Sequence, residues 1–375
     1  MIKSQITKEL SNIPGWRTNR KIVVFESDDW GSIRMSSKEA LEALHKKGLP
    51  VKQCHYNSFD ALESDTDVSA LFDVLSSQKN SLGRTPIFTN VAIVGNPDFD
   101  KIREDHFQKY HVESFTKTLE RYPCHSQVEG LIHNGILEKL IYPIFHGREH
   151  LNVTRWMNYL KEGNRSFQLA FSQGVTGISR GFENEKLKDV QAAFDLDNIQ
   201  EIHYLRTVIK EGLAMFEDFY QFKAKYFVPT NGPFNNQLES ALFDGGVKYI
   251  NTAKKQLEPM GEGIYKKNYR YIGKKNALGQ IYITRNCFFE PSSFENRNWV
   301  DSCLNEIEIA FRWKKPAVIS THRVNYIGFI DEKNRSKGLT QLKSLIQRIL
   351  QKYPDVEFMT SVELGDLIAN GKKID

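Results

Sequence analysis

The chain of 375 residues has little cysteine and no long apolar run, and both absences exclude classes of protein. No C-x-x-C pair occurs, which excludes a zinc ribbon and a thioredoxin-like redox motif; the four cysteines are Cys54, Cys124, Cys287 and Cys303. No apolar stretch approaches the roughly 18 residues of a membrane-spanning helix, and the mean hydropathy is −0.48. The N-terminus lacks the apolar region of a signal peptide, so we expect a cytoplasmic protein without a membrane partner.

An excess of charge of one sign is also missing. The chain has 51 basic and 46 acidic residues, and its net charge of +5 is too small to indicate a nucleic-acid partner. One stretch, 254–275, is nevertheless basic and interleaved with tyrosine; its basic residues are Lys254, Lys255, Lys266, Lys267, Arg270, Lys274 and Lys275. We interpret it as a solvated loop or hairpin, with a patch for an anionic ligand as the alternative.

Internal repeats and long Pro/Gly/Ser linkers are absent, so we expect a single domain over residues 1–375. What recurs is a short apolar strand followed by an amphipathic stretch. The predicted strands are Ile22–Phe25, Ile87–Val94, Ile141–Phe145, Phe167–Phe171, Lys225–Val228, Val247–Asn251, Gln280–Thr284, Pro316–Ser320 and Val356–Met359. The predicted helices are Ser37–Lys47, Asn198–Phe222 and Leu339–Gln351. This alternation predicts an α/β fold with a parallel sheet, and the number of units indicates a barrel.

Polar residues follow the apolar runs, where the active sites of such barrels lie. They are Asp28 and Asp29, His146, Asn231, Asn286 and His322. The two aspartates are crowded like charges, which is typical of a metal site or of proton transfer. Neighbouring residues on a regular strand point to opposite faces, so both aspartates can face one site only if the strand has ended there.

The segment HGREH places His146 and His150 at i and i+4, a spacing typical of paired metal ligands. The spacing also arises by chance in a chain with ten histidines. Together with one aspartate, the two histidines would make the three protein ligands of a catalytic zinc site with an open position. The second aspartate and the late His322 would then be available as base and acid.

This ordered set resembles the motifs of the polysaccharide deacetylase superfamily, the metal-dependent sugar deacetylases of carbohydrate esterase family four. Glu26-Ser27-Asp28-Asp29 is similar to the T-F-D-D motif of that family, and 146–150 to its H-[ST]-x-x-H motif. Segment 226–232 is similar to its R-x-P motif, and Ser320-Thr321-His322 to its last motif. The resemblance implies a divergent branch with a distorted (β/α)7 barrel of the glycoside hydrolase/deacetylase type.

The same resemblance implies an activity and a role for each motif residue. The implied reaction is the removal of acetyl groups from a polysaccharide or sugar derivative. Asp29, His146 and His150 would bind a divalent metal, with Zn²⁺ as the expected ion and Co²⁺, Ni²⁺ or Mn²⁺ as alternatives. Asp28 would act as the base and His322 as the acid. The implied partner is a carbohydrate, and oligomer formation stays open.

The chain also departs from the family pattern. Val228 stands where the family has an arginine that braces the catalytic aspartate, and Arg148 and Arg323 are considered as its replacements. Glu26 stands where the family has threonine, and it is either part of a polar network that replaces the contact of the lost arginine or a sign of different chemistry. The long gap between the first two motifs predicts an insertion at 95–140, either lid-like or oligomer-forming.

Alternative interpretations stay open for the residues that face the substrate and for the class of reaction. Trp30, Asn231 and Trp299 are candidates for the wall that faces the sugar, and each has a core or loop position as its alternative. A glycoside hydrolase on the same barrel would need two carboxylates flanking the scissile bond, and these are Glu26 with Asp28, or either with Asp195. A non-catalytic carbohydrate-binding protein would bind its ligand without metal-dependent hydrolysis.

Overall fold

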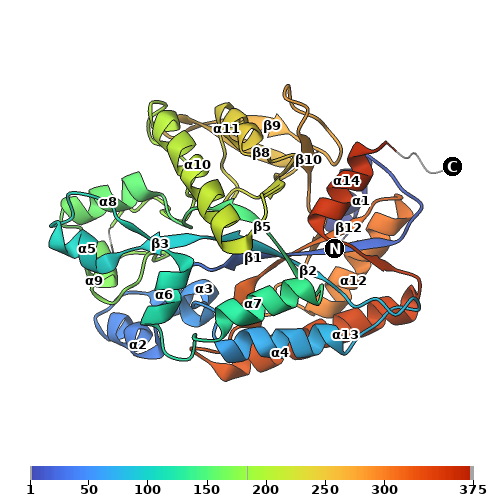
Figure 1. The fold of residues 1–375 in the computed structure, drawn as a ribbon, viewed down its shortest axis with the longest axis horizontal. Coiled ribbons are helices and arrows are strands. Elements are labelled where there is room, and N and C mark those ends of the chain that lie inside the picture. The colour runs from blue at the N-terminus through green and yellow to red at the C-terminus, as the bar shows by residue number, and fades with distance from the viewer. Residues whose placement is uncertain (1, 184, 372–375) are drawn as a thin grey trace.

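The computed structural model describes residues 2–183 and 185–371, and a parallel sheet lies at its centre (Figure 1). Within this part of the chain the sheet has nine strands in the order β10-β7-β6-β5-β2-β1-β12-β11, and β13 pairs with the start of β1. All of these pairs are parallel. The strands are β1 (Ile22–Trp30), β2 (Phe88–Ile93), β5 (Ile141–Gly147), β6 (Tyr226–Phe227), β7 (Tyr249–Asn251), β10 (Ile281–Ile283), β11 (Cys287–Phe288), β12 (Ala317–His322) and β13 (Glu357–Phe358).

Helices cover the sheet and bury its strands. Strand β1 is buried along its whole length, because parallel sheets have helices on both faces. In Figure 1, α4, α7 and α13 run along the lower side of the sheet and α10 lies on the upper side. The α-helices are α1 (Ile2–Ser11), α2 (Lys38–Lys46), α3 (His55–Phe59), α4 (Asp65–Ser76), α5 (Phe99–Glu104), α6 (Phe115–Arg121), α7 (Val128–Leu137), α8 (Val153–Lys161), α9 (Arg165–Ser172), α10 (Glu201–Tyr220), α11 (Glu239–Asp244), α12 (Trp299–Arg312), α13 (Glu332–Lys352) and α14 (Ser361–Ala369).

The α/β class and the parallel sheet expected from the sequence are confirmed. The sheet is curled but open, because no pairing within the described residues joins β10 to β11. Both strands at the opening are short, with three and two residues, so their ladders supply few hydrogen bonds with which to close a ring. The structure therefore shows a partly closed barrel-like sheet.

One predicted strand is wrong. Residues Phe167–Phe171 form α9 instead, and the side chain of Asn164 accepts a hydrogen bond from the backbone N–H of Phe167 as the helix N-cap. Phe167, Ala170 and Phe171 are buried at helical spacing. The prediction failed because a short apolar run does not distinguish a strand from a buried helix by its periodicity alone.

The range 95–140 contains several elements of its own. Strand β3 (Gly95–Pro97) pairs antiparallel with β4 (Val112–Ser114), and α5, α6 and α7 complete the range. Helix α7 contacts β5 and α4, so the end of the range belongs to the layer that covers the sheet. A lid-like or oligomer-forming role for the remainder stays a prediction.

The basic stretch forms the antiparallel hairpin of β8 (Lys255–Gly261) and β9 (Ile264–Tyr269), as one of the two interpretations expected. Its lysines are largely exposed, whereas Gln256, Glu258 and Pro259 on β8 are buried. None of the described helices is both long enough and apolar enough to cross a membrane.

Candidate metal centre

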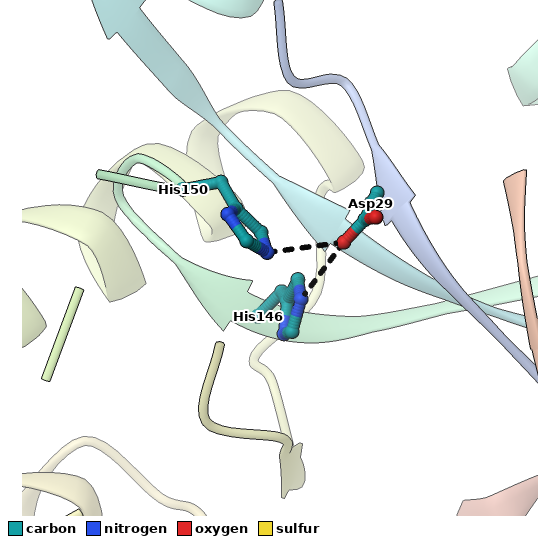
Figure 2. A group of neighbouring side chains, drawn as sticks. All are labelled: Asp29, His146 and His150. Carbon is teal, nitrogen blue, oxygen red and sulfur yellow. Dashed lines mark ion pairs between the residues drawn. The ribbon is translucent and has the colours of Figure 1, made fainter. Parts of the chain in front are cut away.

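Asp29, His146 and His150 converge at the carboxyl ends of β1 and β5 (Figure 2). Oδ1 of Asp29 lies 3.4 Å from Nε2 of His146 and 3.1 Å from Nε2 of His150. One ligand atom from each of the three residues lies within 4.8 Å of the others, and all three residues are buried. A single divalent cation requires this kind of proximity from three protein ligands.

The hydrogen bonding of His146 fits a metal ligand. Nδ1 of His146 lies 2.7 Å from the carbonyl oxygen of Val228, so it carries the proton and donates it there. Nε2 of His146 and Nδ1 of His150 are buried and have no hydrogen-bond partner among the described residues. A buried polar atom without a partner destabilises a fold, and a cation bound at Nε2 of His146 would remove that cost.

Asp29 reaches this cluster through a bulge in β1. The strand continues to Trp30, so the expectation that it ends before Asp29 is wrong. The register between β1 and β2 instead shifts between Ser27 and Trp30, and Asp29 has a φ of 79°, in the left-handed region. A bulge re-aims a side chain, and aspartate tolerates a positive φ better than most residues. Asp28 and Asp29 therefore line one cavity although they are neighbours on a strand.

Arg285 braces Asp28. Its Nη2 lies 2.5 Å from Oδ1 of Asp28 and its Nη1 lies 2.6 Å from Oδ2, which makes a bidentate pair. Burial alone would raise the pKa of Asp28, but the charge of Arg285 and its hydrogen bonds outweigh burial and hold that pKa below its usual value. Asp28 is therefore ionised at neutral pH. Arg285 follows β10, one residue before the Asn286 that the sequence pattern singled out, and the pattern missed it.

Arg148 and Arg323, the replacements considered from the sequence, have other partners. Nε of Arg148 lies 2.5 Å from Glu149, and its Nη1 pairs with Glu211. The fully buried Arg323 binds Asp60 at 3.1 Å and Glu63 at 2.7 Å. Among the described residues neither arginine pairs with Asp28, so both expectations are wrong.

Glu26, the third carboxylate on β1 after Asp28 and Asp29, is fully buried, and both of its carboxylate oxygens are hydrogen-bonded. Its Oε1 accepts hydrogen bonds from the hydroxyls of Tyr226 and Ser361, each at 2.7 Å. Its Oε2 accepts from Nδ2 of Asn251 at 2.9 Å and from Nε of Arg285 at 2.6 Å. Glu26 thus anchors the guanidinium that pairs with Asp28, and it lies one layer beneath the cavity.

His322 faces Asp28 from β12 and is oriented by a second carboxylate. Its Nδ1 lies 2.7 Å from Oε1 of Glu290, and its Nε2 lies 3.6 Å from Oδ2 of Asp28. Burial disfavours the imidazolium, but Glu290, through its charge and hydrogen bond, together with the charges of Asp28 and Asp29, raises the pKa of His322 to about 10. His322 is therefore protonated at neutral pH. Sequence reasoning missed Glu290, which lies between β11 and α12.

One cavity of about 240 Å³ joins these groups. It is lined by Asp28, Asp29, His146, His150, Val228, Pro229, Asn231, Gly232, Asn251, Thr252, Ala253, Arg285 and His322. The structure therefore brings together the base, acid and ligand candidates and Asn231. Asp189 binds the amide of Asn231 at 2.8 Å, at the rim.

Trp30 and Trp299 do not line this cavity, and their assignment to a sugar-facing wall is wrong. Both rings are buried in the hydrophobic core. Nε1 of Trp30 donates to Oγ of Ser27 at 2.9 Å, and Trp299 begins α12 with the guanidinium of Arg297 over its ring. A ring that stacks on a sugar must be exposed, whereas both of these rings pack in the core because each buries a large apolar area there.

Comparisons with known proteins find similarity in structure but not in sequence. No protein-family model matches the chain, and no curated protein matches it. A solved structure described as a candidate polysaccharide deacetylase from Mycobacterium smegmatis has a TM-score of 0.46 and 11% identity, with 96% of this chain and 94% of that chain covered. A second, from Pseudomonas aeruginosa PAO1, has a TM-score of 0.47 and 9% identity, with 95% and 94% covered.

A third similar structure is described as a pseudoenzyme of the CE4 family from Bacillus anthracis. It has a TM-score of 0.37 and 12% identity, with 95% of this chain and 70% of that chain covered. Among solved structures, the chain is therefore similar to proteins described as polysaccharide deacetylases, at low sequence identity.

Proposed function

We propose that this protein is a divalent-metal-dependent hydrolase that removes acetyl groups from a polysaccharide or sugar derivative. One observation carries the proposal: Nε2 of His146, buried and without a hydrogen-bond partner among the described residues, lies 3.4 Å from Oδ1 of Asp29, and Nε2 of His150 lies 3.1 Å from the same oxygen. The base and acid candidates lie in the same cavity. In this proposal the open sheet is a distorted barrel of the deacetylase type, and Asn231 faces the sugar.

Asp29, His146 and His150 would hold the cation, with Zn²⁺ as the expected ion because two imidazoles and one carboxylate suit it. A cation at this site supplies Lewis acidity, which makes a nearby water more acidic and an acyl carbonyl more electrophilic. Asp28 accepts the proton of the attacking water at a carboxylate oxygen. The Arg285 pair keeps Asp28 ionised for this task and fixes its orientation.

His322 supplies the proton that leaves with the sugar. Glu290 holds Nδ1, so Nε2 is the atom that faces the cavity and donates to the departing amine or alkoxide. The two proton-transfer groups are thus kept in opposite states at neutral pH, Asp28 ionised beside a guanidinium and His322 protonated beside a carboxylate. This division of states is what a hydrolysis with one base and one acid requires.

A glycoside hydrolase has less support from the same geometry. Of the three carboxylates considered for it, Asp28 alone lines the cavity. Glu26 is saturated by Tyr226, Ser361, Asn251 and Arg285. Asp195 binds Arg155 at 3.1 Å and the hydroxyl of Tyr265 at 2.9 Å. Neither of these two is positioned to be the second carboxylate at a glycosidic bond.

The proposal is tested by metal analysis together with product analysis. We expect the purified protein to contain about one divalent metal ion per chain, and to release acetate from acetylated sugar oligomers without new reducing ends. A chelator should stop acetate release, and Zn²⁺ or Co²⁺ should restore it. Reducing ends without acetate would identify a glycoside hydrolase. Sugar binding with neither product would identify a non-catalytic binding protein.

Replacing Glu290 with glutamine should shift the alkaline limb of the pH–rate profile to lower pH. The imidazolium is the active form of His322, so turnover falls as the pH rises through its pKa. Glu290 raises that pKa, and the uncharged amide removes this contribution, so the sign of the shift is downward. The measurement is kcat across neutral and alkaline pH. Glu113→Gln, a buried glutamate paired with Arg121, is the control and should leave the limb in place. An unmoved limb in Glu290→Gln would contradict the assigned acid.

A further inference from the structure

A second cavity, of about 340 Å³, lies beside the segment that joins β10 to β11, where the sheet is open. It is lined by Ser11, Asn12, Pro14, Lys254, Tyr269, Arg270, Tyr271, Ile272, Thr284, Asn286, Lys315 and Pro316. The end of α1 forms one wall, and the chain leaving β9 forms another. Three of these residues are basic and none is acidic, so the lining has a net positive charge.

The ammonium group of Lys254 lacks a counter-charge. Among the described residues its Nζ makes one hydrogen bond, to Oγ of Ser11 at 3.0 Å, and no ion pair. The charge of Glu306 raises the pKa of Lys254, but Glu306 is already paired with Lys8 at 2.6 Å and with Arg297 at 3.1 Å. Burial lowers the pKa of Lys254. A half-buried ammonium without an anion is costly, and a bound anion would offset that cost.

The other two cations of the cavity have neutral partners. Nε of Arg270 lies 2.9 Å from Oε1 of Gln256, and its guanidinium lies over the ring of Tyr282 at 4.1 Å. Nζ of Lys315 donates to the carbonyl oxygens of Pro14, Gly15 and Trp16 at 2.6–2.9 Å. Burial and the charges of Arg17 and Lys254 lower the pKa of Lys315 to about 8. Like charges thus accumulate here without a carboxylate between them.

Besides the three cations and the uncharged polar residues Ser11, Asn12, Thr284 and Asn286, the lining is apolar or aromatic. Pro14, Ile272 and Pro316 supply aliphatic surface, and Tyr269 and Tyr271 supply exposed rings. A cavity with a few placed polar groups in a mostly apolar lining is typical of a small-molecule site. We propose that this second cavity binds a small organic carboxylate, whose charged oxygens meet Lys254 and whose apolar body contacts Tyr271, Ile272 and Pro316.

This site is separate from the candidate metal centre but shares two chain segments with it. Ala253 and Arg285 line the first cavity, whereas their neighbours Lys254 and Asn286 line the second. The proposal does not rest on the hydrolase activity, since none of its residues lines the first cavity. A ligand against Asn286 lies next to the guanidinium that braces Asp28, so we expect occupancy to change turnover in an active enzyme.

The test titrates the protein, as purified with its metal, with benzoate at constant ionic strength and measures the heat of binding. Benzyl alcohol is the matched neutral probe, and inorganic phosphate is the probe without an apolar body. We expect benzoate to bind at one site per chain and to bind at least about tenfold more tightly than either of the other two. Lys254→Met should weaken benzoate binding by about tenfold or more. Lys255→Met, which removes the exposed neighbouring lysine, should not.

Several results would overturn the proposal. Equal affinity for benzoate and benzyl alcohol would show that the cations do not recognise the ligand, and phosphate bound as tightly as benzoate would exclude the apolar contact. Benzoate binding that is lost in Asp29→Ala but kept in Lys254→Met would place the anion in the first cavity. If Lys254→Met fails to fold, the thermal shift of the wild-type protein decides: benzoate must raise Tm more than benzyl alcohol does at the same ionic strength.

Discussion

Replacing Asp29 with alanine is expected to remove the metal and the hydrolytic activity together. Asp29 is the one carboxylate of the three-residue cluster, and its Oδ1 lies near Nε2 of both His146 and His150. Two neutral imidazoles alone form an incomplete set for a catalytic cation. We expect the metal content of Asp29→Ala to fall well below one ion per chain, and acetate release to fall to that of the chelated protein.

Asp28→Asn is the matched control, because it changes the neighbouring aspartate by one atom. Asp28 pairs with Arg285 and is not among the cluster of ligand atoms. We expect this variant to keep its metal and to lose about 10²- to 10⁴-fold in kcat, the usual contribution of a general base. Full metal content in Asp29→Ala, or metal loss in Asp28→Asn with Asp29→Ala unaffected, would mean that the roles of the two aspartates are assigned wrongly.

Replacing Arg285 with methionine should have the largest effect on stability. The side chain of Arg285 is 12% exposed, and it pairs with Glu26 and Asp28, whose side chains are 0% and 8% exposed. Its removal leaves the buried carboxylate of Glu26 without a counter-charge and leaves Asp28 with the imidazolium of His322 at 3.6 Å. Breaking a buried pair in this way costs about 3–5 kcal/mol in the free energy of unfolding. Urea unfolding at neutral pH measures this. The charge of Arg285 lowers the pKa of Asp28, so the pKa of Asp28 should rise in the variant. A larger fraction of Asp28 would then be protonated, and the activity should fall.

Two further variants separate charge, geometry and site. Arg285→Lys keeps the charge but not the planar fork that reaches both carboxylates, so it should lie between the wild type and Arg285→Met in stability. Arg155→Met removes a buried arginine that pairs with Asp195 and Asp197, away from the cavity lining. It should reduce stability without changing the pH–rate profile. Equal effects of Arg155→Met and Arg285→Met on the profile would show that Arg285 has no special relation to Asp28.

The sequence allowed most of the sheet to be predicted, because buried parallel strands are apolar runs that alternate with amphipathic helices. The helix predicted over Asn198–Phe222 forms α10, and its buried residues recur at helical spacing, at Ile202, Leu205, Ile209, Leu213 and Phe216. The strand predicted at 167–171 failed because its apolar residues suit either a strand or a helix. The closure of the sheet could not be predicted either, because it depends on whether β10 and β11 pair across the opening, and local patterns do not report that.

The groups of the candidate site and their order could be read from the sequence: two aspartates after an early strand, two histidines after a middle strand and one histidine after a late strand. Strand ends of a parallel sheet meet at one edge, so this order implied their convergence. The partners of these groups were decided by the tertiary structure. Arg285 lies 257 residues from Asp28, and Glu290 lies 32 residues from His322. Packing between segments that are distant in the chain produces the bulge at Asp29 and the burial of Trp30 and Trp299. The spacing of residues within one segment cannot predict such packing.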